Sequence, residues 1–188
     1  MSLELEKGRT GALVISVAAL GLLFVAAGCT RPAETEVAQA SEPCAEDEVR
    51  CNAECAKLDV SIEHCGKCGR RCFQRQECQE GVCRGLGVVS ARDLVSQLDD
   101  KDFLLINVRY PPVGVIPGTD ATVPHDRLDK LKDVIGPDPD TRIVLYCGTA
   151  QRVMTPLRTL QEAGYRSIAY LHGGVTAWRM AGLPVEDN

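Results

Sequence analysis

The chain has 188 residues, a formal net charge of −5 and ten cysteines. This length allows one domain of ordinary size plus smaller pieces. No segment carries a basic face, which argues against nucleic acid as a partner, and the many cysteines favour an oxidising compartment over the cytosol.

The first 28 residues have the organisation of an export signal. Lys7 and Arg9 precede an uncharged stretch over residues 11–28, as in signal peptides. A retained transmembrane helix is the alternative, because this stretch is nearly long enough to span a bilayer. Ala26-Ala27-Gly28-Cys29 resembles the lipobox of bacterial lipoproteins, in which the cysteine is acylated before cleavage. The resemblance implies a signal peptide over 1–28 and a lipid anchor on Cys29.

Residues 29–43 are expected to be a disordered tether, because they are rich in Ala, Glu, Thr and Pro and have almost no large apolar side chains. Thr30 follows the anchor residue, in place of the Asp that commonly retains bacterial lipoproteins in the inner membrane. The expected location is therefore the cell envelope, on the outer membrane and facing the periplasm, with the lipid membrane as a partner.

Residues 44–83 form a cysteine-rich module whose only aromatic residue is Phe73. So small an apolar core cannot offset the conformational entropy of the chain without covalent cross-links. Four disulfides are expected, with their pairing left open, and a zinc site that includes Cys65-x-x-Cys68 is the alternative. The eight cysteines are Cys44, Cys51, Cys55, Cys65, Cys68, Cys72, Cys78 and Cys83.

The segment from Cys51 to Cys83, with His64-Cys65-Gly66-Lys67-Cys68-Gly69 at its centre, resembles the Stig1-like cysteine repeats of exported bacterial proteins and plant stigma proteins. That family has Asn at the position of His64. We interpret His64 as a turn residue. The resemblance implies little about activity. A spacer or a module that binds a protein partner is expected.

Residues 84–188 alternate apolar strands with helices. Strands are expected over residues 86–89, 103–108, 143–146 and 168–171. Helices are expected over residues 90–98 and 128–135 and from residue 174 through 178. A further helix is expected to follow the third strand and to end at Gly164. One apolar face of the second helix would consist of Leu128, Leu131, Val134 and Ile135. Strands separated by helices predict an α/β fold with a parallel sheet and helices on both faces, whose ligand lies at the carboxyl ends of the strands.

Cys147 directly follows the strand predicted over residues 143–146. Small residues in the next loop let backbone N–H groups point inward, and the start of the following helix adds positive potential. Such a cradle favours the thiolate, the form that attacks sulfur, and Arg152 can hold an anionic substrate. A buried structural cysteine is the alternative. The loop expected to bind substrate is Gly148, Thr149, Ala150 and Gln151.

Cys147-x4-Arg152 resembles the active-site loop of rhodaneses. Asn107-Val108-Arg109 resembles the Asp-Val-Arg strand end of that family, and Ile116-Pro117-Gly118 resembles its Ile-Pro-Gly turn. The stretch over residues 173–184, from Gly173-Gly174 through Trp178 to Gly182-Leu183-Pro184, resembles its Gly-Gly…Trp…Gly-Leu-Pro ending. The resemblance covers residues 84–188, one complete rhodanese-like domain.

This resemblance implies a sulfurtransferase that needs no cofactor or metal. Cys147 would take a sulfane sulfur from thiosulfate or a persulfide, hold it as a persulfide and pass it to a thiol or cyanide. Arg152 would assist it by binding the donor.

Several residues depart from the rhodanese pattern. Asn107 replaces an Asp, Val115 replaces a His, and Ala150 and Val153 replace a frequent Gly and Ser. Pro156 further predicts a helix that begins late or is kinked. These departures keep open a catalytically weak rhodanese fold that acts as a protein- or anion-binding module.

A phosphatase or arsenate reductase is disfavoured, because the Cys-x5-Arg loop of those enzymes is one residue longer than the loop here. His125 and His172 are not expected to be catalytic, since persulfide chemistry needs an ionised thiol more than a base. Arg109 is interpreted as a structural ion-pair residue and Trp178 as a core residue.

Overall fold

The computed structural model of the protein describes residues 43–186. The predicted signal peptide, the predicted lipidation site at Cys29 and the tether up to residue 42 lie outside them. Among the described helices, none is both long and apolar enough to cross a membrane.

A six-stranded sheet organises the described chain, in the order β3-β4-β8-β7-β5-β6. Strands β4, β8, β7, β5 and β6 run parallel, and β3 pairs antiparallel with β4. The strands are β3 (Glu77–Gln79), β4 (Val82–Val89), β5 (Leu104–Asn107), β6 (Ala121–Thr122), β7 (Ile143–Tyr146) and β8 (Ser167–Leu171). The predicted parallel sheet is confirmed, and β3 and β6 are short additions at its two edges.

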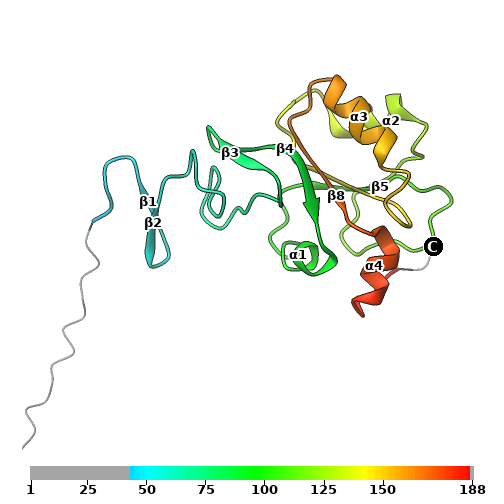
Figure 1. Ribbon diagram of the computed structural model, residues 1–188, viewed down its shortest axis with the longest axis horizontal. Coiled ribbons are helices and arrows are strands. Elements are labelled where there is room, and N and C mark those ends of the chain that lie inside the picture. Colours follow the sequence, from blue (N-terminus) through cyan, green and yellow to red (C-terminus); the bar gives the residue numbers. More distant parts are fainter. Residues whose placement is uncertain (1–42, 187–188) are drawn as a thin grey trace, which may run out of the picture. The chain divides into compact units, whose positions relative to one another are not determined.

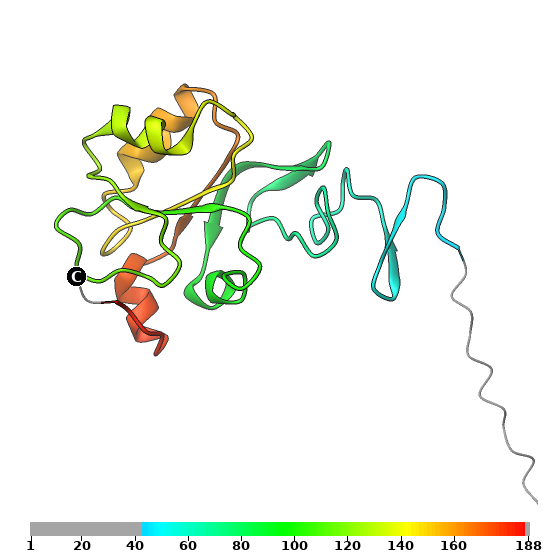
Figure 2. The ribbon, with the colours of Figure 1, turned by 180° about the vertical axis from the view of Figure 1, so that it is seen from behind.

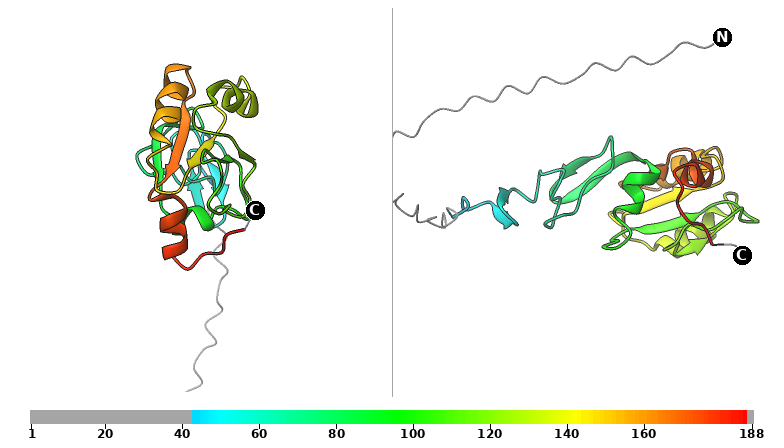
Figure 3. Two further views of the ribbon diagram at one scale, coloured as in Figure 1. Left: turned by 90° about the vertical axis from the view of Figure 1, so that its right-hand side faces the viewer. Right: turned by 90° about the horizontal axis from the view of Figure 1, so that it is seen from below.

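Helices cover both faces of this sheet, as predicted (Figures 1 and 2). Helices α1 (Ala91–Val95) and α4 (Gly174–Met180) contact each other on one face, and α2 (Leu128–Ile135) and α3 (Met154–Glu162) contact each other on the other face (Figure 3). Because successive side chains of a strand point in opposite directions, β7 supplies both faces. Val144 and Tyr146 pack with the α1–α4 layer, and Ile143 and Leu145 with the α2–α3 layer.

Two helices differ from the prediction, α1 at its end and α2 in its apolar face. Ser90 caps α1 as expected, accepting a hydrogen bond from the Asp93 N–H at 3.2 Å, but α1 ends at Val95 instead of continuing to residue 98. The predicted apolar face of α2 is narrower than expected, since Val134 is exposed.

The helix that follows Cys147 begins late, which was one of the two outcomes predicted from Pro156. Val153 is the N-cap of α3 and Met154 its first residue, so Pro156 lies in the first turn. First-turn N–H groups have no partner within their helix, and a proline there removes no helical hydrogen bond.

The predicted four disulfides of the cysteine module are confirmed. They join Cys44 to Cys55, Cys51 to Cys68, Cys65 to Cys78 and Cys72 to Cys83. Cys65 and Cys68, the pair considered for zinc, therefore belong to two different disulfides. The first part of the module forms a small antiparallel hairpin of β1 (Val49–Cys51) and β2 (Glu54–Ala56).

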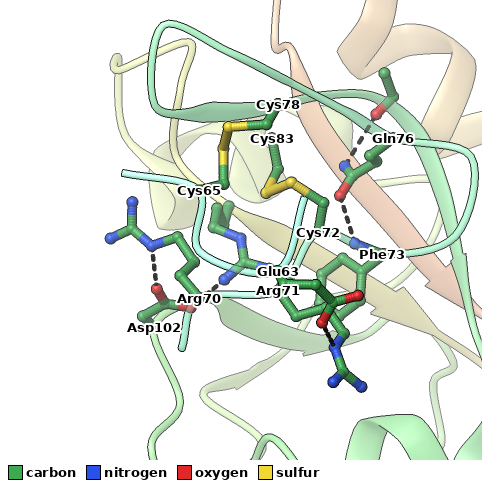
Figure 4. Close-up of a disulfide and its surroundings, with 12 residues drawn as sticks. Glu63, Cys65, Arg70, Arg71, Cys72, Phe73, Gln76, Cys78, Cys83 and Asp102 are labelled. Atoms are coloured by element: carbon green, nitrogen blue, oxygen red, sulfur yellow. Dashed lines mark hydrogen bonds and ion pairs between the residues drawn. A yellow bond between two sulfur atoms is a disulfide. The ribbon is translucent and has the colours of Figure 1, made fainter. Parts of the chain in front are cut away.

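The second part of the module is built into the sheet and its core. Strand β4 begins at Val82, so the predicted boundary between residues 83 and 84 falls inside a strand. Phe73 is only 4% exposed and meets Phe103 edge to face, with ring centroids 5.6 Å apart. Beside it, Gln76 Nε2 donates hydrogen bonds to the carbonyl oxygens of Gly85 and Ile168 at 3.1 and 3.4 Å. Figure 4 shows both residues next to the Cys72–Cys83 disulfide.

A partly buried charge cluster adds to this junction. The Asp102 carboxylate accepts hydrogen bonds from Arg70 Nε at 2.6 Å and from Arg142. Arg142 also donates to the Arg71 carbonyl oxygen at 2.9 Å, and its guanidinium lies over the Phe73 ring. Burial opposes ionisation of Asp102, but the attraction of Arg142 and the hydrogen bond from Arg70 outweigh it, so the pKa of Asp102 is lowered. The module and the sheet thus share one core.

Candidate active site

Cys147 lies at the carboxyl edge of the parallel sheet, directly after β7, where it was predicted. Among the described cysteines it is the one that forms no disulfide. Its side chain packs in the α2–α3 layer and the residue is 1% exposed. Burial is compatible with both a nucleophile and a structural cysteine, so the loop around the thiol is the informative feature.

Residues 148–153 form an irregular loop between β7 and α3. Gly148 and Ala150 are buried in it, whereas Thr149, Gln151 and Arg152 are exposed. Ala150 has a φ of +70°, in the left-handed region that costs a residue with a Cβ roughly 1–2 kcal/mol. Strain of this kind persists only where the surrounding structure imposes it, and it is concentrated at functional sites.

The start of α4 holds the backbone of this loop. The Val175 N–H donates to the Cys147 carbonyl oxygen at 2.9 Å, and the Thr176 N–H donates to that of Gly148 at 3.0 Å. A Cβ on Gly174 would lie 2.1 Å from the Cys147 carbonyl oxygen, so only glycine permits this approach. The role of Gly174 in positioning the loop was not predicted, although the Gly173-Gly174 pair had been noted.

The end of β7 is also held through Tyr146, which packs in the same layer as α4. The Tyr146 hydroxyl accepts a hydrogen bond from the Ile116 N–H at 3.2 Å and shares one with Thr119 Oγ1 at 2.7 Å. Burial raises the pKa of Tyr146, so this hydroxyl stays protonated. The predicted turn at Ile116 is thereby tied to the strand that carries Cys147.

The structure brings Arg109 to the Cys147 loop. Its Nη1 atom lies 3.4 Å from the position that a Cβ on Gly148 would occupy. No carboxylate forms an ion pair with Arg109 among residues 43–186. The interpretation of Arg109 as an ion-pair residue is therefore wrong. Strand adjacency could have revealed its position, because β5 and β7 are parallel neighbours that end at the same edge.

Arg152, the predicted anion-binding residue, is exposed and has no hydrogen-bond or ion-pair partner in the described part of the chain. The His125 and His172 rings likewise form no hydrogen bond within residues 43–186, and Trp178 is buried in the core as expected. His64 lies in a bend, where its Nδ1 accepts a hydrogen bond from the Gly69 N–H at 2.9 Å and its Nε2 lies 2.7 Å from Glu54 Oε1.

Comparison with known families agrees with this fold. Residues 90–181 match the rhodanese-like domain. Residues 29–85 match the stigma-specific STIG1-like protein family. Both predicted resemblances are thus supported, and the fold of the C-terminal part is rhodanese-like.

Individual relatives have modest identity to the chain. An HTH-type transcriptional regulator from Mycobacterium tuberculosis is 32% identical over 105 residues, which are 53% of this chain and 45% of the regulator. A sulfurtransferase from Allochromatium vinosum is 29% identical over 90 residues, 46% of this chain and 81% of that protein. A solved polysulfide-sulfur transferase homodimer from Wolinella succinogenes is 29% identical with a TM-score of 0.46, covering 54% of this chain and 78% of that one. The chain spans about half the length of the first curated relatives it matches.

Proposed function

We propose that this protein is a lipid-anchored sulfurtransferase or persulfide carrier of the cell envelope, with Cys147 as the sulfur-carrying nucleophile. The observation that carries the proposal is a free thiol at the carboxyl edge of a rhodanese-like sheet. Every other described cysteine is in a disulfide, so in this part of the chain Cys147 alone offers a thiolate for attack on sulfur. The sulfurtransferase among the relatives supports the same class of reaction.

The reaction with thiosulfate needs no further reactant until the acceptor binds. The Cys147 thiolate attacks the sulfane sulfur, and a bond forms between Cys147 Sγ and that sulfur. The bond from the sulfane sulfur to the sulfonate sulfur breaks, and its electron pair leaves with sulfite. A cyanide ion or a thiolate then takes the outer sulfur of the persulfide, as thiocyanate or a new persulfide, and Cys147 returns to the thiolate.

The decisive test is sulfur loading of the purified full chain with its disulfides intact. Incubation with thiosulfate should add one sulfur atom to Cys147, visible by intact-mass measurement, and cyanide should remove it. Cys147→Ser should abolish loading, because a serine alkoxide cannot form a persulfide. Arg152→Ala should weaken loading by about 1–3 kcal/mol, the contribution of a hydrogen bond to a charged group.

The near-complete burial of Cys147 is equally compatible with a second candidate, a rhodanese fold that binds a protein or an anion without transferring sulfur. The same experiment separates the two functions. If the folded chain gains no sulfur from thiosulfate or from a persulfide donor, the enzyme proposal fails and the binding module replaces it.

A further inference from the structure

We propose that Arg109 is an anion-binding residue of the Cys147 site and selects anionic sulfur donors over neutral ones. The inference rests on the proposed function and adds to it the charge class of the donor. Arg152, the residue expected to bind the donor, is exposed on the loop, and Arg109 would add a second, half-buried positive charge.

The structure places the Arg109 side chain at the loop that follows Cys147. Asn107 is paired with Tyr146, so Arg109 stands level with Gly148, the residue after Cys147. The Cδ and Nη1 atoms of Arg109 lie 3.6 and 3.4 Å from the point that a Gly148 Cβ would occupy. The Arg109 side chain therefore runs along the Gly148 backbone, at van der Waals distance from where a side chain at 148 would begin.

The charge of Arg109 has no protein partner in the described chain. Arg109 is half-buried, and its Nε is fully buried without a hydrogen-bond acceptor. Leaving a charged donor unsatisfied costs free energy, which an acceptor arriving with the substrate would recover. Val113 Cγ2 lies 3.7 Å from the same Gly148 position, so an apolar side chain also lies at this point of the loop.

Asn107 contributes to this arrangement. Its Oδ1 accepts a hydrogen bond from the Arg109 N–H at 2.9 Å, which fixes where the arginine side chain begins. An aspartate at 107 could accept the same hydrogen bond, but its negative charge would partly cancel that of Arg109. The neutral amide leaves the whole guanidinium charge available to a donor such as thiosulfate, whose several oxygens can accept paired N–H bonds.

Alkylation of Cys147 tests this inference independently of sulfur transfer. Iodoacetate and iodoacetamide both alkylate a thiolate by displacing iodide, but only iodoacetate carries a negative charge. Arg109→Gln should lower the ratio of the iodoacetate rate to the iodoacetamide rate by about three- to tenfold, and Arg109→Lys should restore part of it. High salt should reduce the difference in this ratio between the unsubstituted chain and Arg109→Gln, because it screens the charge of Arg109. Arg92→Gln, which removes an exposed positive charge from α1, should leave the ratio unchanged.

Thiosulfate kinetics provide the second measurement. Arg109→Gln should raise KM for thiosulfate by a similar factor with little change in kcat, and the unfolding midpoint should stay near that of the unsubstituted chain. A purely structural role would instead slow both alkylating reagents equally and lower the unfolding midpoint, which would overturn the inference.

The remaining outcomes separate this inference from the proposed function. If Arg109→Gln leaves the alkylation ratio unchanged and the chain still loads sulfur, the anion site is wrong and the sulfurtransferase proposal stands. If Arg109→Gln lowers the ratio but the chain cannot load sulfur, the anion site stands and the sulfurtransferase proposal is wrong. If neither reagent reaches Cys147 in the folded chain, the anion site fails, and sulfur loading alone decides the proposed function.

Discussion

At the residue scale, Ala150 is the position where the chain stores strain next to Cys147. Its φ of +70° suits glycine, and the departure from the family pattern at this residue was visible in the sequence. We expect Ala150→Gly to raise the free energy of unfolding by about 0.5–1 kcal/mol, because relief of the Cβ clash exceeds the entropy that glycine adds to the unfolded chain. Urea unfolding with the disulfides intact measures this change.

Ala163→Gly is the matched control, since Ala163 has a φ of −80° and is exposed at the end of α3. There the same substitution should lower the free energy of unfolding by up to about 1 kcal/mol, because only the entropic cost of glycine remains. A destabilising Ala150→Gly of similar size would show that the left-handed conformation at 150 is not the one the folded chain adopts.

At the element scale, β4 joins the disulfide module to the rhodanese-like sheet. Phe73 carries the apolar part of this junction, packed against Phe103 and Arg142. We expect Phe73→Ala to destabilise the whole described fold by about 3–5 kcal/mol, the usual cost of truncating a buried aromatic side chain. A single cooperative transition that shifts to lower urea concentration, followed by far- and near-UV circular dichroism, would confirm this.

Ile62→Ala is the control in the same module, because Ile62 is exposed and its truncation should change stability by no more than about 0.5 kcal/mol. Equal unfolding curves for the two variants would mean that residues 65–83 do not unfold together with the sheet. The junction also explains why the sulfur-loading test uses the full chain. A fragment that begins at Arg84 would lack both Phe73 and the first residues of β4.

At the scale of the whole molecule, the proposed anchor determines where the thiol can act. We expect the expressed full chain to fractionate with membranes, because acyl chains on Cys29 would each contribute about 0.8 kcal/mol per buried methylene. Cys29→Ser should accumulate as an uncleaved precursor, detected by intact mass. Thr30→Ser, which keeps Cys29 and a small polar neighbour, serves as the control and should still be processed. Recovery of the unsubstituted chain as a free, unacylated species would contradict the anchor.

Local patterns in the sequence determined most of the fold. Apolar runs and amphipathic spacing placed β4, β5, β7 and β8 and the four helices in order, because such patterns depend on neighbouring residues alone. The position of Cys147 at a strand end followed for the same reason. The late start of α3 was foreseen as one of two outcomes because the effect of Pro156 is also local.

Only the tertiary structure decided how distant segments meet. The pairing of the eight module cysteines, the fusion of β3 and β4 with the sheet, and the approach of Arg109 and Gly174 to the Cys147 loop all join residues far apart in the chain. The sequence showed which side chains could carry charge, sulfur or apolar surface, but not which of them would be neighbours. Neighbours are selected by the packing of the complete core, whose free energy depends on all of its contacts at once.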